Sequence, residues 1–441
     1  MKVHFISLGC DKNLVDSEVM LGMLAKEGYS FTEDETEAEA IVINTCCFIN
    51  DAKEESINTI LEMAKLKESG QVKALIVTGC LAQRYQEEIQ KEIEEVDAII
   101  GTTAIETIVT ALNEVLSGKS SNHMASLAQA PLEGKERIIT TGGYYSYLKI
   151  AEGCDKHCTY CIIPQIRGKY RSIPEEALVS EAEMLAEKGI KELILVAQET
   201  TLYGMDLYGC KTLPRLLQKL CRVEGIEWIR ILYCYPEEIT EELIQTIKEE
   251  EKICHYLDIP VQSGSDDILK RMGRRTNTAQ IGELVTRLRA EIPDICIRTT
   301  LITGFPGETE EDHENTMAFI DEMEFDRLGV FTYSPEEDTP AAAMDNQIEE
   351  ETKIRRRDEI MELQQEIAFE AAKDMKGRRL CAMVEGKLSE EDVYVARTYK
   401  DAPDVDGYLF ITTDRTLMSG DFVEVVVTGS HEYDMIGELV E

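Results

Sequence analysis

The stretch that decides the fold is YLKIAEGCDKHCTYCIIP, residues 147–164, where an apolar strand pattern leads directly into three closely spaced cysteines. Gly153 precedes Cys154 and Pro164 follows Cys161, and glycine and proline at these places favour an irregular loop. A C-x3-C-x2-C loop supplies three thiolates to a cubane iron–sulfur cluster and leaves the fourth iron without a protein ligand. The stretch therefore predicts a strand that delivers a reactive metal site to one face of a sheet.

A second interpretation of the same cysteines is a buried helix. Positions 154, 158 and 161 also fall on one helical face, and buried free cysteine behaves as a small hydrophobic residue. Structural zinc sites are closed by four protein ligands, and fully ligated clusters normally pass electrons. A loop with three thiolates therefore favours catalysis over either of those uses.

The strand and helix pattern repeats through the middle of the chain. Six apolar strand patterns are separated by amphipathic helical patterns: residues 147–151, 192–197, 228–233, 256–261, 296–302 and 328–333. Six such units predict a partial βα barrel, and barrel enzymes place their sites at the carboxyl ends of the strands. Residues just beyond those ends are candidates for a cofactor pocket: Gln198, Thr200, residues 262–264 and residues 304–308. For residues 304–307, a plain glycine and proline turn is the alternative.

Three strand patterns near the amino terminus end at cysteines. Each cysteine comes one or two positions after its strand pattern: Cys10 after residues 3–8 and Gly9, Cys46 after residues 40–45, and Cys80 after residues 74–78 and Gly79. Apolar strands alternating with helices predict a parallel sheet covered on both faces, whose strand ends line one crevice. The pattern thus predicts three thiols at one rim, and the alternative is chance placement of core cysteines.

Composition favours an intracellular enzyme. The 441 residues suffice for two or three domains, and the 13 cysteines occur without a visible secretory signal. We therefore expect a reducing compartment, the cytoplasm, in which thiols are ligands or core residues. Seven cysteines without metal spacing are predicted to be core: Cys47, Cys210, Cys221, Cys234, Cys254, Cys296 and Cys381. No stretch approaches eighteen consecutive apolar residues, so no membrane partner is expected.

The net charge of −39 bears on the partner. Naked nucleic acid usually binds to a basic domain or stripe, because phosphate contacts drive that binding. Basic clusters occur at residues 270–275 and 355–357, and their helical contexts predict solvated faces. The charge therefore favours a basic protein partner over RNA.

These patterns divide the chain into four segments. Residues 1–117 carry the first sheet, and residues 118–143 lack apolar periodicity and contain serine and glycine, which predicts a flexible linker. Residues 144–376 carry the partial barrel and a long helix before Gly377. Residues 377–441 carry five short strand patterns, which predict a small antiparallel β-barrel. The predicted fold class is thus α/β: a parallel-sheet domain, a partial (βα)6 barrel and a small β-barrel.

The spacing of the three central cysteines, the tyrosine before the last of them and the following Ile-Ile-Pro resemble the radical S-adenosylmethionine (SAM) enzymes. In that family SAM chelates the open iron, and an electron from the cluster cleaves it to a radical that abstracts hydrogen from carbon. The resemblance implies that Cys154, Cys158 and Cys161 are the catalytic cluster ligands. It implies a cofactor-binding role for Tyr160, Gln198, Thr200, Gln262, Arg298, Gly304 and Gly307.

Three amino-terminal segments look like the signatures of the methylthiotransferases: SLGCDKNLVDSE at residues 7–18, NTC at residues 44–46 and GCLAQRY at residues 79–85. Those enzymes carry a second 4Fe-4S cluster, and the resemblance implies that Cys10, Cys46 and Cys80 hold it. Cys47 stands beside an expected ligand, but alternating side-chain directions favour one of the two, and motif position favours Cys46. The carboxy-terminal strands resemble a TRAM module, usually an RNA-binding addition; acidic residues outnumber basic ones about two to one there, which favours a basic protein.

Together with residues 7–18, two further segments resemble the branch that modifies an aspartate of small-subunit ribosomal protein S-twelve: YSPEEDTP at residues 333–340 and APDVDG at residues 402–407. The tRNA-modifying branch usually has arginine where Glu336 and Glu337 stand. Charge and motifs therefore agree on the ribosomal protein as substrate. A tRNA adenosine is the alternative substrate.

The resemblance implies a reaction that uses both clusters. One SAM is cleaved at the central cluster and the radical takes hydrogen from the β-carbon of the target aspartate. A sulfur at the amino-terminal cluster, methylated by a second SAM, then couples to that carbon. The implied partners are the ribosomal protein, within or near the ribosome, a low-potential electron donor and a sulfur donor. An alternative of a different class is an iron–sulfur electron carrier or sensor, which would consume no SAM.

Overall fold

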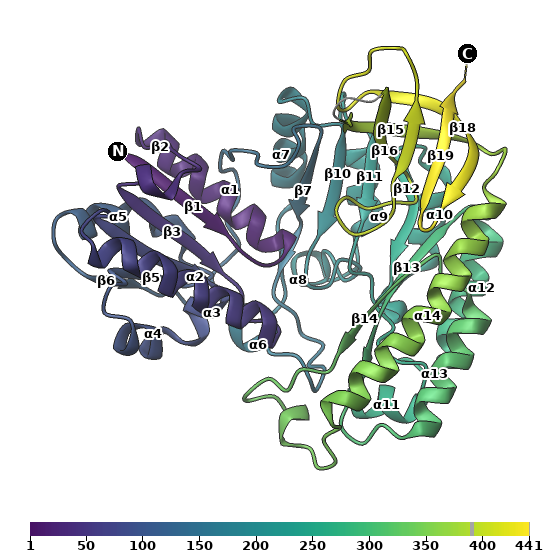
Figure 1. The fold of residues 1–441 in the computed structure, drawn as a ribbon, viewed down its shortest axis with the longest axis horizontal. Coiled ribbons are helices and arrows are strands. Elements are labelled where there is room, and N and C mark those ends of the chain that lie inside the picture. The colour runs from purple at the N-terminus through teal and green to yellow at the C-terminus, as the bar shows by residue number, and fades with distance from the viewer. Residues whose placement is uncertain (389–391, 441) are drawn as a thin grey trace.

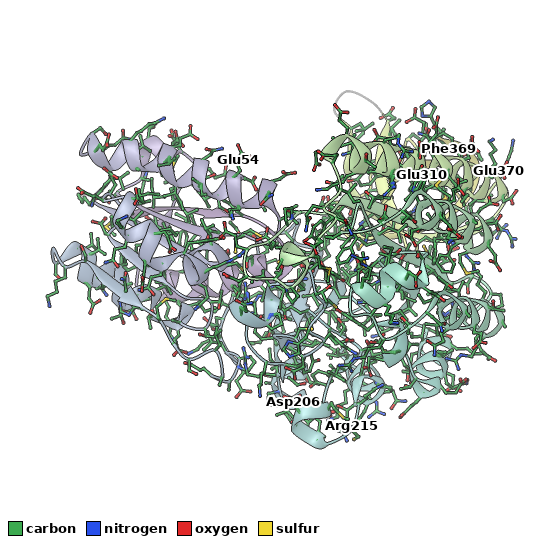
Figure 2. The ribbon with its side chains drawn as sticks, turned by 90° about the horizontal axis from the view of Figure 1, so that it is seen from below. Glu54, Asp206, Arg215, Glu310, Phe369 and Glu370 are labelled. Carbon is green, nitrogen blue, oxygen red and sulfur yellow. The ribbon has the colours of Figure 1, made fainter. Side chains whose placement is uncertain are left out.

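The computed structural model describes residues 1–388 and 392–440, which form three bodies in chain order (Figure 1). The amino-terminal body stands to one side of the other two, and Figure 2 shows the same arrangement from below, with Glu54 on its outer surface. Within the described residues, no helix is both long and apolar enough to cross a membrane.

The amino-terminal body is a parallel sheet with the strand order β2-β1-β3-β4-β5-β6. Its strands are β1 Lys2–Ser7, β2 Ser30–Phe31, β3 Ala40–Thr45, β4 Ala74–Gly79, β5 Ala98–Ile100 and β6 Ser121–His123. Its helices are α1 Asp11–Lys26, α2 Asn50–Glu68, α3 Cys80–Arg84, α4 Gln86–Glu92 and α5 Ile108–Leu116. Strands β3 and β4 are buried along their whole length, because α1 and α5 cover one face and α2 and α3 the other.

The central body is a second parallel sheet, ordered β14-β13-β12-β11-β10-β7, which confirms the predicted partial barrel. Its strands are β7 Tyr145–Lys149, β10 Glu192–Val196, β11 Trp228–Ile231, β12 Ile253–Asp258, β13 Cys296–Thr303 and β14 Arg327–Thr332. The larger helices around it are α7 Glu175–Glu187, α9 Leu213–Leu220, α10 Glu241–Glu249, α12 Thr278–Glu291, α13 Glu310–Met323 and α14 Glu350–Asp374. The short elements β8 Ala151–Glu152, α6 Ile163–Ile166, β9 Arg171–Ser172, α8 Met205–Tyr208 and α11 Asp266–Arg271 lie in its loops.

The carboxy-terminal body is a closed barrel, as predicted, with the order β15-β16-β17-β19-β18. Its strands are β15 Arg379–Lys387, β16 Val393–Thr398, β17 Leu409–Thr412, β18 Phe422–His431 and β19 Asp434–Leu439. All neighbouring pairs are antiparallel except β17 and β19, which run parallel. Glu441, the last residue of the predicted domain, lies outside the described residues.

Buried ion pairs fasten this small barrel to the central body. The Glu192 carboxylate pairs with Arg230 Nε at 2.8 Å and with Arg397 Nη2 at 2.7 Å, and all three side chains are fully buried. Asp401 pairs with Arg327 at 2.5 Å, and Asp406 accepts a hydrogen bond from the Tyr256 hydroxyl at 2.7 Å. Some carboxylates of the small barrel therefore face the central body and hold the two bodies together. The remaining exposed carboxylates are those available to a partner.

Parts of the predicted flexible linker, residues 118–143, contact the neighbouring bodies. Residues Ser121–His123 form β6, the edge strand of the first sheet. Arg137 is 5% exposed and pairs with Glu18 of α1 at 2.6 Å and with Glu181 of α7 at 2.5 Å. At these places the segment is held by strand pairing and by charged contacts, which leave no apolar periodicity in the sequence.

The predictions for three cysteines and for the two basic clusters need correction in detail. Cys210 is exposed, so it is not a core cysteine, and Cys221 and Cys381 are half-buried. The basic clusters are not simply solvated faces, because Arg274 and Arg356 are 8% and 4% exposed. Arg356 pairs with Glu308 at 2.7 Å, and this buried partner explains its position.

Candidate active site

The loop from Gly153 to Cys161 begins where β7 and β8 end, at the carboxyl end of the central sheet. Gly153 has φ +80°, and a Cβ there would lie 2.2 Å from the Lys169 carbonyl oxygen, so only glycine allows this close approach. The Cys154 amide donates to the Gly168 carbonyl at 3.2 Å, and the Thr159 amide donates to the Met272 carbonyl at 2.9 Å. The segment is irregular, which confirms the loop interpretation over the buried helix.

Two donor groups lie beside the thiol of Cys158. The Tyr235 hydroxyl lies 3.6 Å from Cys158 Sγ, and Arg274 Nη1 lies 3.9 Å from the same sulfur. The Arg274 guanidinium stacks on the Tyr235 ring at 4.3 Å. Burial raises the pKa of Cys154 to about 11, so its thiol keeps its proton until a cation replaces it. Three neighbouring cysteines with adjacent donors are a chemically suitable set for an iron–sulfur cluster.

The predicted pocket residues after β10 and β12 lie at this same rim. Gln198 accepts from the Gly153 amide at 2.9 Å and donates to Glu152 at 2.8 Å, so it supports the cysteine loop directly. Thr200 is buried, and its amide donates to the Tyr233 carbonyl at 3.0 Å. Gln262 has φ +76°, and its buried Oε1 has no hydrogen-bond partner among the described residues. Strained backbone and an unpaired buried oxygen both favour a ligand-binding position.

The other predicted pocket residues have packing or ion-pair partners. Tyr160 packs edge to face against Phe305, with ring centroids 6.4 Å apart. A Cβ on Gly304 would lie 2.2 Å from Lys353 Cγ, and one on Gly307 would lie 2.4 Å from the Arg271 guanidinium. The structure thus gives these glycines the role of admitting two cationic side chains. Arg298 pairs with Asp258 at 3.1 Å inside the barrel and lies 3.5 Å from Asp406.

Sequence reasoning missed the fully buried Glu199, which stands between two predicted pocket residues. Burial raises its pKa to about 7. The Lys156 ammonium, from the cysteine loop, lies 3.5 Å from Glu199, 3.2 Å from Glu237 and also contacts Glu238. Its neighbours Gln198 and Thr200 are predicted pocket residues because they lie just beyond a strand end. The same position, two residues after the apolar strand pattern, was the signal that could have found this carboxylate.

The amino-terminal cysteines meet at the carboxyl ends of β1, β3 and β4. Cys10 directly precedes α1, Cys46 follows β3, and Cys80 begins α3. Gly9 has φ +88°, and a Cβ there would lie 2.6 Å from Cys46 Cβ, so the strand ends approach closely only because residue 9 is glycine. The amino-terminal end of the 16-residue α1 favours negative charge beside Cys10.

Burial raises the thiol pKa of both Cys46 and its neighbour Cys47, so packing and not the pKa distinguishes the two cysteines. Burial and then the nearby Cys80 raise the pKa of Cys46 to about 12, and Cys10 acts on it as well. Cys47 is fully buried in the apolar cluster between the sheet and α2. Among the described residues, no group of three His, Cys, Asp or Glu side chains encloses a single metal ion. A cubane cluster has a different requirement, because each of its thiolates binds a different iron atom.

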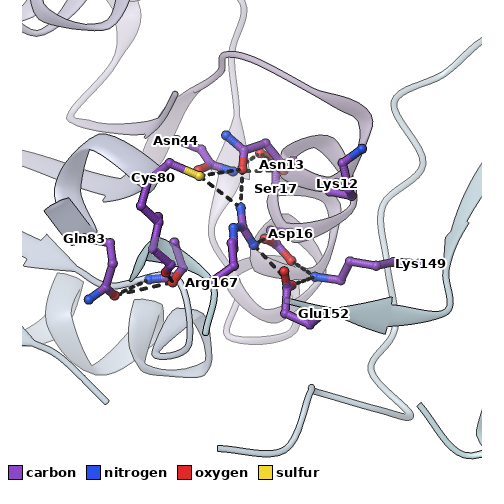
Figure 3. Close-up of polar contacts among 12 residues, drawn as sticks. Lys12, Asn13, Asp16, Ser17, Asn44, Cys80, Gln83, Lys149, Glu152 and Arg167 are labelled. Atoms are coloured by element: carbon purple, nitrogen blue, oxygen red, sulfur yellow. Dashed lines mark hydrogen bonds and ion pairs between the residues drawn. The ribbon is translucent and has the colours of Figure 1, made fainter. Parts of the chain in front are cut away.

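One arginine connects the two cysteine sites (Figure 3). Arg167 follows the central cysteine loop, is 1% exposed, and places Nη2 3.5 Å from Cys80 Sγ of the amino-terminal body. The same guanidinium contacts Asn13, pairs with Asp16 at 2.8 Å and pairs with Glu152 at 3.2 Å. Since Glu152 accepts from Gln198, which also accepts from the Gly153 amide, an unbroken chain of polar contacts joins Cys80 to the central loop.

Replacing Arg167 with methionine is expected to lower the free energy of unfolding by about 3 kcal/mol, because buried Asp16 and Glu152 lose a partner. Lys149 contacts both carboxylates and keeps the cost from rising further. Thermal unfolding followed by circular dichroism measures the effect. Arg171→Met is the control: its guanidinium donates to two backbone carbonyls, so a loss near 1 kcal/mol is expected. Equal melting curves for Arg167→Met and the parent would show that Lys149 alone is enough to neutralise Asp16 and Glu152.

Three family profiles match the chain. Residues 2–101 match one described as "Uncharacterized protein family UPF0004". Residues 148–320 match the radical SAM superfamily, and residues 377–440 match the TRAM domain. The three matches correspond to the three bodies of the structure.

Curated relatives decide the family. "Ribosomal protein uS12 methylthiotransferase RimO" of Lachnoclostridium phytofermentans is 64% identical over 437 residues, covering 99% of both chains. The chain belongs to the RimO family of methylthiotransferases. The protein of the same name from Thermoanaerobacter sp. is 48% identical over 436 residues, again covering 99% of both chains. Membership makes this chain a radical SAM methylthiotransferase, and iron–sulfur chemistry and SAM follow from the family.

Solved structures agree on the fold of this RimO family member. The radical SAM methyltransferase TsrM of Kitasatospora setae aligns with a TM-score of 0.56 at 14% identity, covering 88% of this chain and 79% of that chain. The cobalamin-dependent radical enzyme OxsB aligns with a TM-score of 0.53 at 14% identity, covering 83% of this chain and 56% of that chain. At this identity the likeness concerns the fold alone.

Proposed function

We propose that this enzyme attaches a methylthio group to the β-carbon of an aspartate in ribosomal protein uS12, with SAM and two 4Fe-4S clusters. The reaction would take place in the cytoplasm, at or near the ribosome, and would draw on a low-potential electron donor and a sulfur donor. The use of two clusters is supported by the chain of polar contacts through Arg167, which links the two cysteine sites at one interface. The names of the relatives support uS12 as substrate.

We assign the first cluster to Cys154, Cys158 and Cys161 and the second to Cys10, Cys46 and Cys80. When bound, the clusters and SAM would supply the electron, the hydrogen-abstracting radical and the methylthio group. Gln198 would hold the first loop through the Gly153 amide, and Tyr160, Thr200 and Gln262 would line the SAM pocket. For Arg298, Gly304 and Gly307 the observed contacts support positioning of neighbouring side chains instead.

Side chains at the interface would exclude water from the reacting groups. Arg84 of α3 pairs with Glu336 at 2.6 Å and donates to the Glu337 carbonyl at 2.7 Å. The Tyr85 hydroxyl contacts the Glu337 carboxylate at 3.0 Å. These pairs close the side of the interface beside the amino-terminal cysteines, and a closed site protects reactive intermediates from water.

The same contacts bear on the choice between protein and tRNA. Glu336 and Glu337 stand where the tRNA-modifying branch usually has arginine, and an arginine at position 336 would face Arg84 with like charge. This pairing supports the ribosomal-protein branch, with a tRNA adenosine as the second candidate substrate. An electron carrier, the remaining alternative, would need no rim of polar side chains around the first cysteine loop.

The test is an anaerobic competition. The reconstituted enzyme is given dithionite, SAM, a sulfide source, small ribosomal subunits and unmodified tRNA in one reaction, and both products are analysed by mass spectrometry. A methylthio group on an aspartate of uS12 is the expected result. The same group on a tRNA adenosine would overturn the substrate, and no product with no deoxyadenosine formed would favour the electron carrier.

A further inference from the structure

Lys12 of α1 reaches from the amino-terminal body to the mouth of the central barrel. The residue is 7% exposed, and its ammonium lies 3.3 Å from the centroid of the Tyr233 ring. The ammonium pairs with Asp11 Oδ1 at 2.9 Å. The Tyr233 hydroxyl donates to the same oxygen at 3.2 Å, while the buried Asp11 Oδ2 has no hydrogen-bond partner among the described residues. A charged and incompletely satisfied pair thus lies buried between two bodies.

The position of Tyr233 shows that this pair faces the reaction site. Tyr233 follows the carboxyl end of β11, the same end of the sheet at which the central cysteine loop begins. Its φ of +60° is a strained conformation for a bulky residue, held by the Asp258 carboxylate, which accepts from its amide at 3.1 Å. A strained backbone conformation persists only where surrounding contacts hold it, and such residues cluster at active sites and ligand-binding sites.

Lys12 is connected to both groups of cysteines through near neighbours. It is two residues after Cys10 in the amino-terminal site. On its other side, the ring it contacts is two residues before Tyr235, whose hydroxyl lies 3.6 Å from Cys158 Sγ. Under the proposed function, the target carbon loses hydrogen at one site and gains sulfur from the other, so its carboxylate comes near residues that link the two sites, as Lys12 does.

The other buried lysines nearby show how such an ammonium is normally satisfied in this protein. Lys149 contacts two carboxylates, Asp16 and Glu152, and Lys156 contacts three. Within the described part of the chain, Lys12 pairs with Asp11 alone. An ammonium has three donors, so Lys12 retains the capacity to bind a second carboxylate.

We propose that Lys12 binds the carboxylate of the target side chain and that Asp11 is its resident counter-ion. The inference rests on the proposed function, because it takes an aspartate as substrate. It makes Lys12 a specificity residue: a buried cation between the two clusters selects an acidic side chain over a neutral amide or a nucleobase. Tyr233 sets the direction of the ammonium through the contact with its ring face.

The test compares uS12 with a uS12 in which the target aspartate is changed to asparagine. Equilibrium binding and kcat/KM are measured for the parent enzyme, for Lys12→Gln and for the charge-matched double variant Asp11→Asn/Lys12→Gln. For Lys12→Gln we expect about tenfold weaker binding of the aspartate substrate, a loss of at least a hundredfold in its kcat/KM, and unchanged binding of the asparagine form. The preference for aspartate should therefore disappear.

The double variant separates substrate binding from a structural role. If Lys12 only neutralises Asp11, then removing both charges should restore binding of the aspartate substrate, because no unpaired charge stays buried. If Lys12 binds the substrate, the double variant should fold with the parent's melting temperature and still fail to prefer aspartate. Recovery of the preference in the double variant, or its retention in Lys12→Gln, would overturn the inference alone. A parent enzyme that modifies tRNA and not uS12 would overturn the proposed function and the inference with it.

Discussion

Replacing Cys158 with alanine is expected to abolish SAM cleavage. Cys158 is the central thiol of the loop, 6% exposed, with Tyr235 and Arg274 beside its sulfur. Two thiolates cannot hold the cluster with one open iron, so no electron reaches the sulfonium. The measurement is deoxyadenosine formed per enzyme under dithionite, by liquid chromatography, together with the iron content. We expect deoxyadenosine to fall to background and iron to fall by about half.

Cys210→Ala is the matched control, because Cys210 is an exposed cysteine of the same body. It should form deoxyadenosine at the parent rate and keep all its iron. The assignment of the cluster loop is wrong if Cys158→Ala forms deoxyadenosine as fast as this control. The comparison also excludes a general effect of removing a thiol during reconstitution.

Replacing Cys80 with alanine is expected to separate the two halves of the reaction. Cys80 lies in the amino-terminal body, and the loop that would bind SAM lies in the central body. Deoxyadenosine should therefore still form, at a rate within a few-fold of the parent, while the methylthio product on uS12 disappears. Mass spectrometry of uS12 and chromatography of deoxyadenosine on one reaction measure both outcomes. Iron should again fall by about half, this time from the other site.

Cys47→Ala is the control for this variant, because Cys47 is adjacent to a proposed ligand but buried in the apolar core. It should retain the second cluster and the product, at a small cost in stability from the lost buried sulfur. Normal product from Cys80→Ala would contradict the proposal that the second cluster supplies the sulfur. Loss of product from Cys47→Ala with product retained by Cys46→Ala would exchange the two cysteines in the assignment.

Sequence patterns predicted the fold well where a strand or helix buries apolar side chains at regular positions. Strands such as β3 and β4 are buried on both faces, so their apolar runs were visible without any tertiary information. The linker prediction missed the contacts of residues 118–143 for the opposite reason. Arg137 and its neighbours are ordered by charged partners from α1 and α7, and such contacts leave no periodic pattern in the sequence.

The sequence by itself determined the cysteine loops, because their spacing is local and glycine is required at the positive φ of Gly9 and Gly153. It also determined the family through those same segments. Only the tertiary structure decided which charged residues bring the two cysteine sites together. Arg167 meets Cys80 across 87 positions of sequence, and Lys12 meets Tyr233 across the interface of two bodies. Such pairs depend on how separately folded sheets dock, and buried charges in them must find partners that no local pattern specifies.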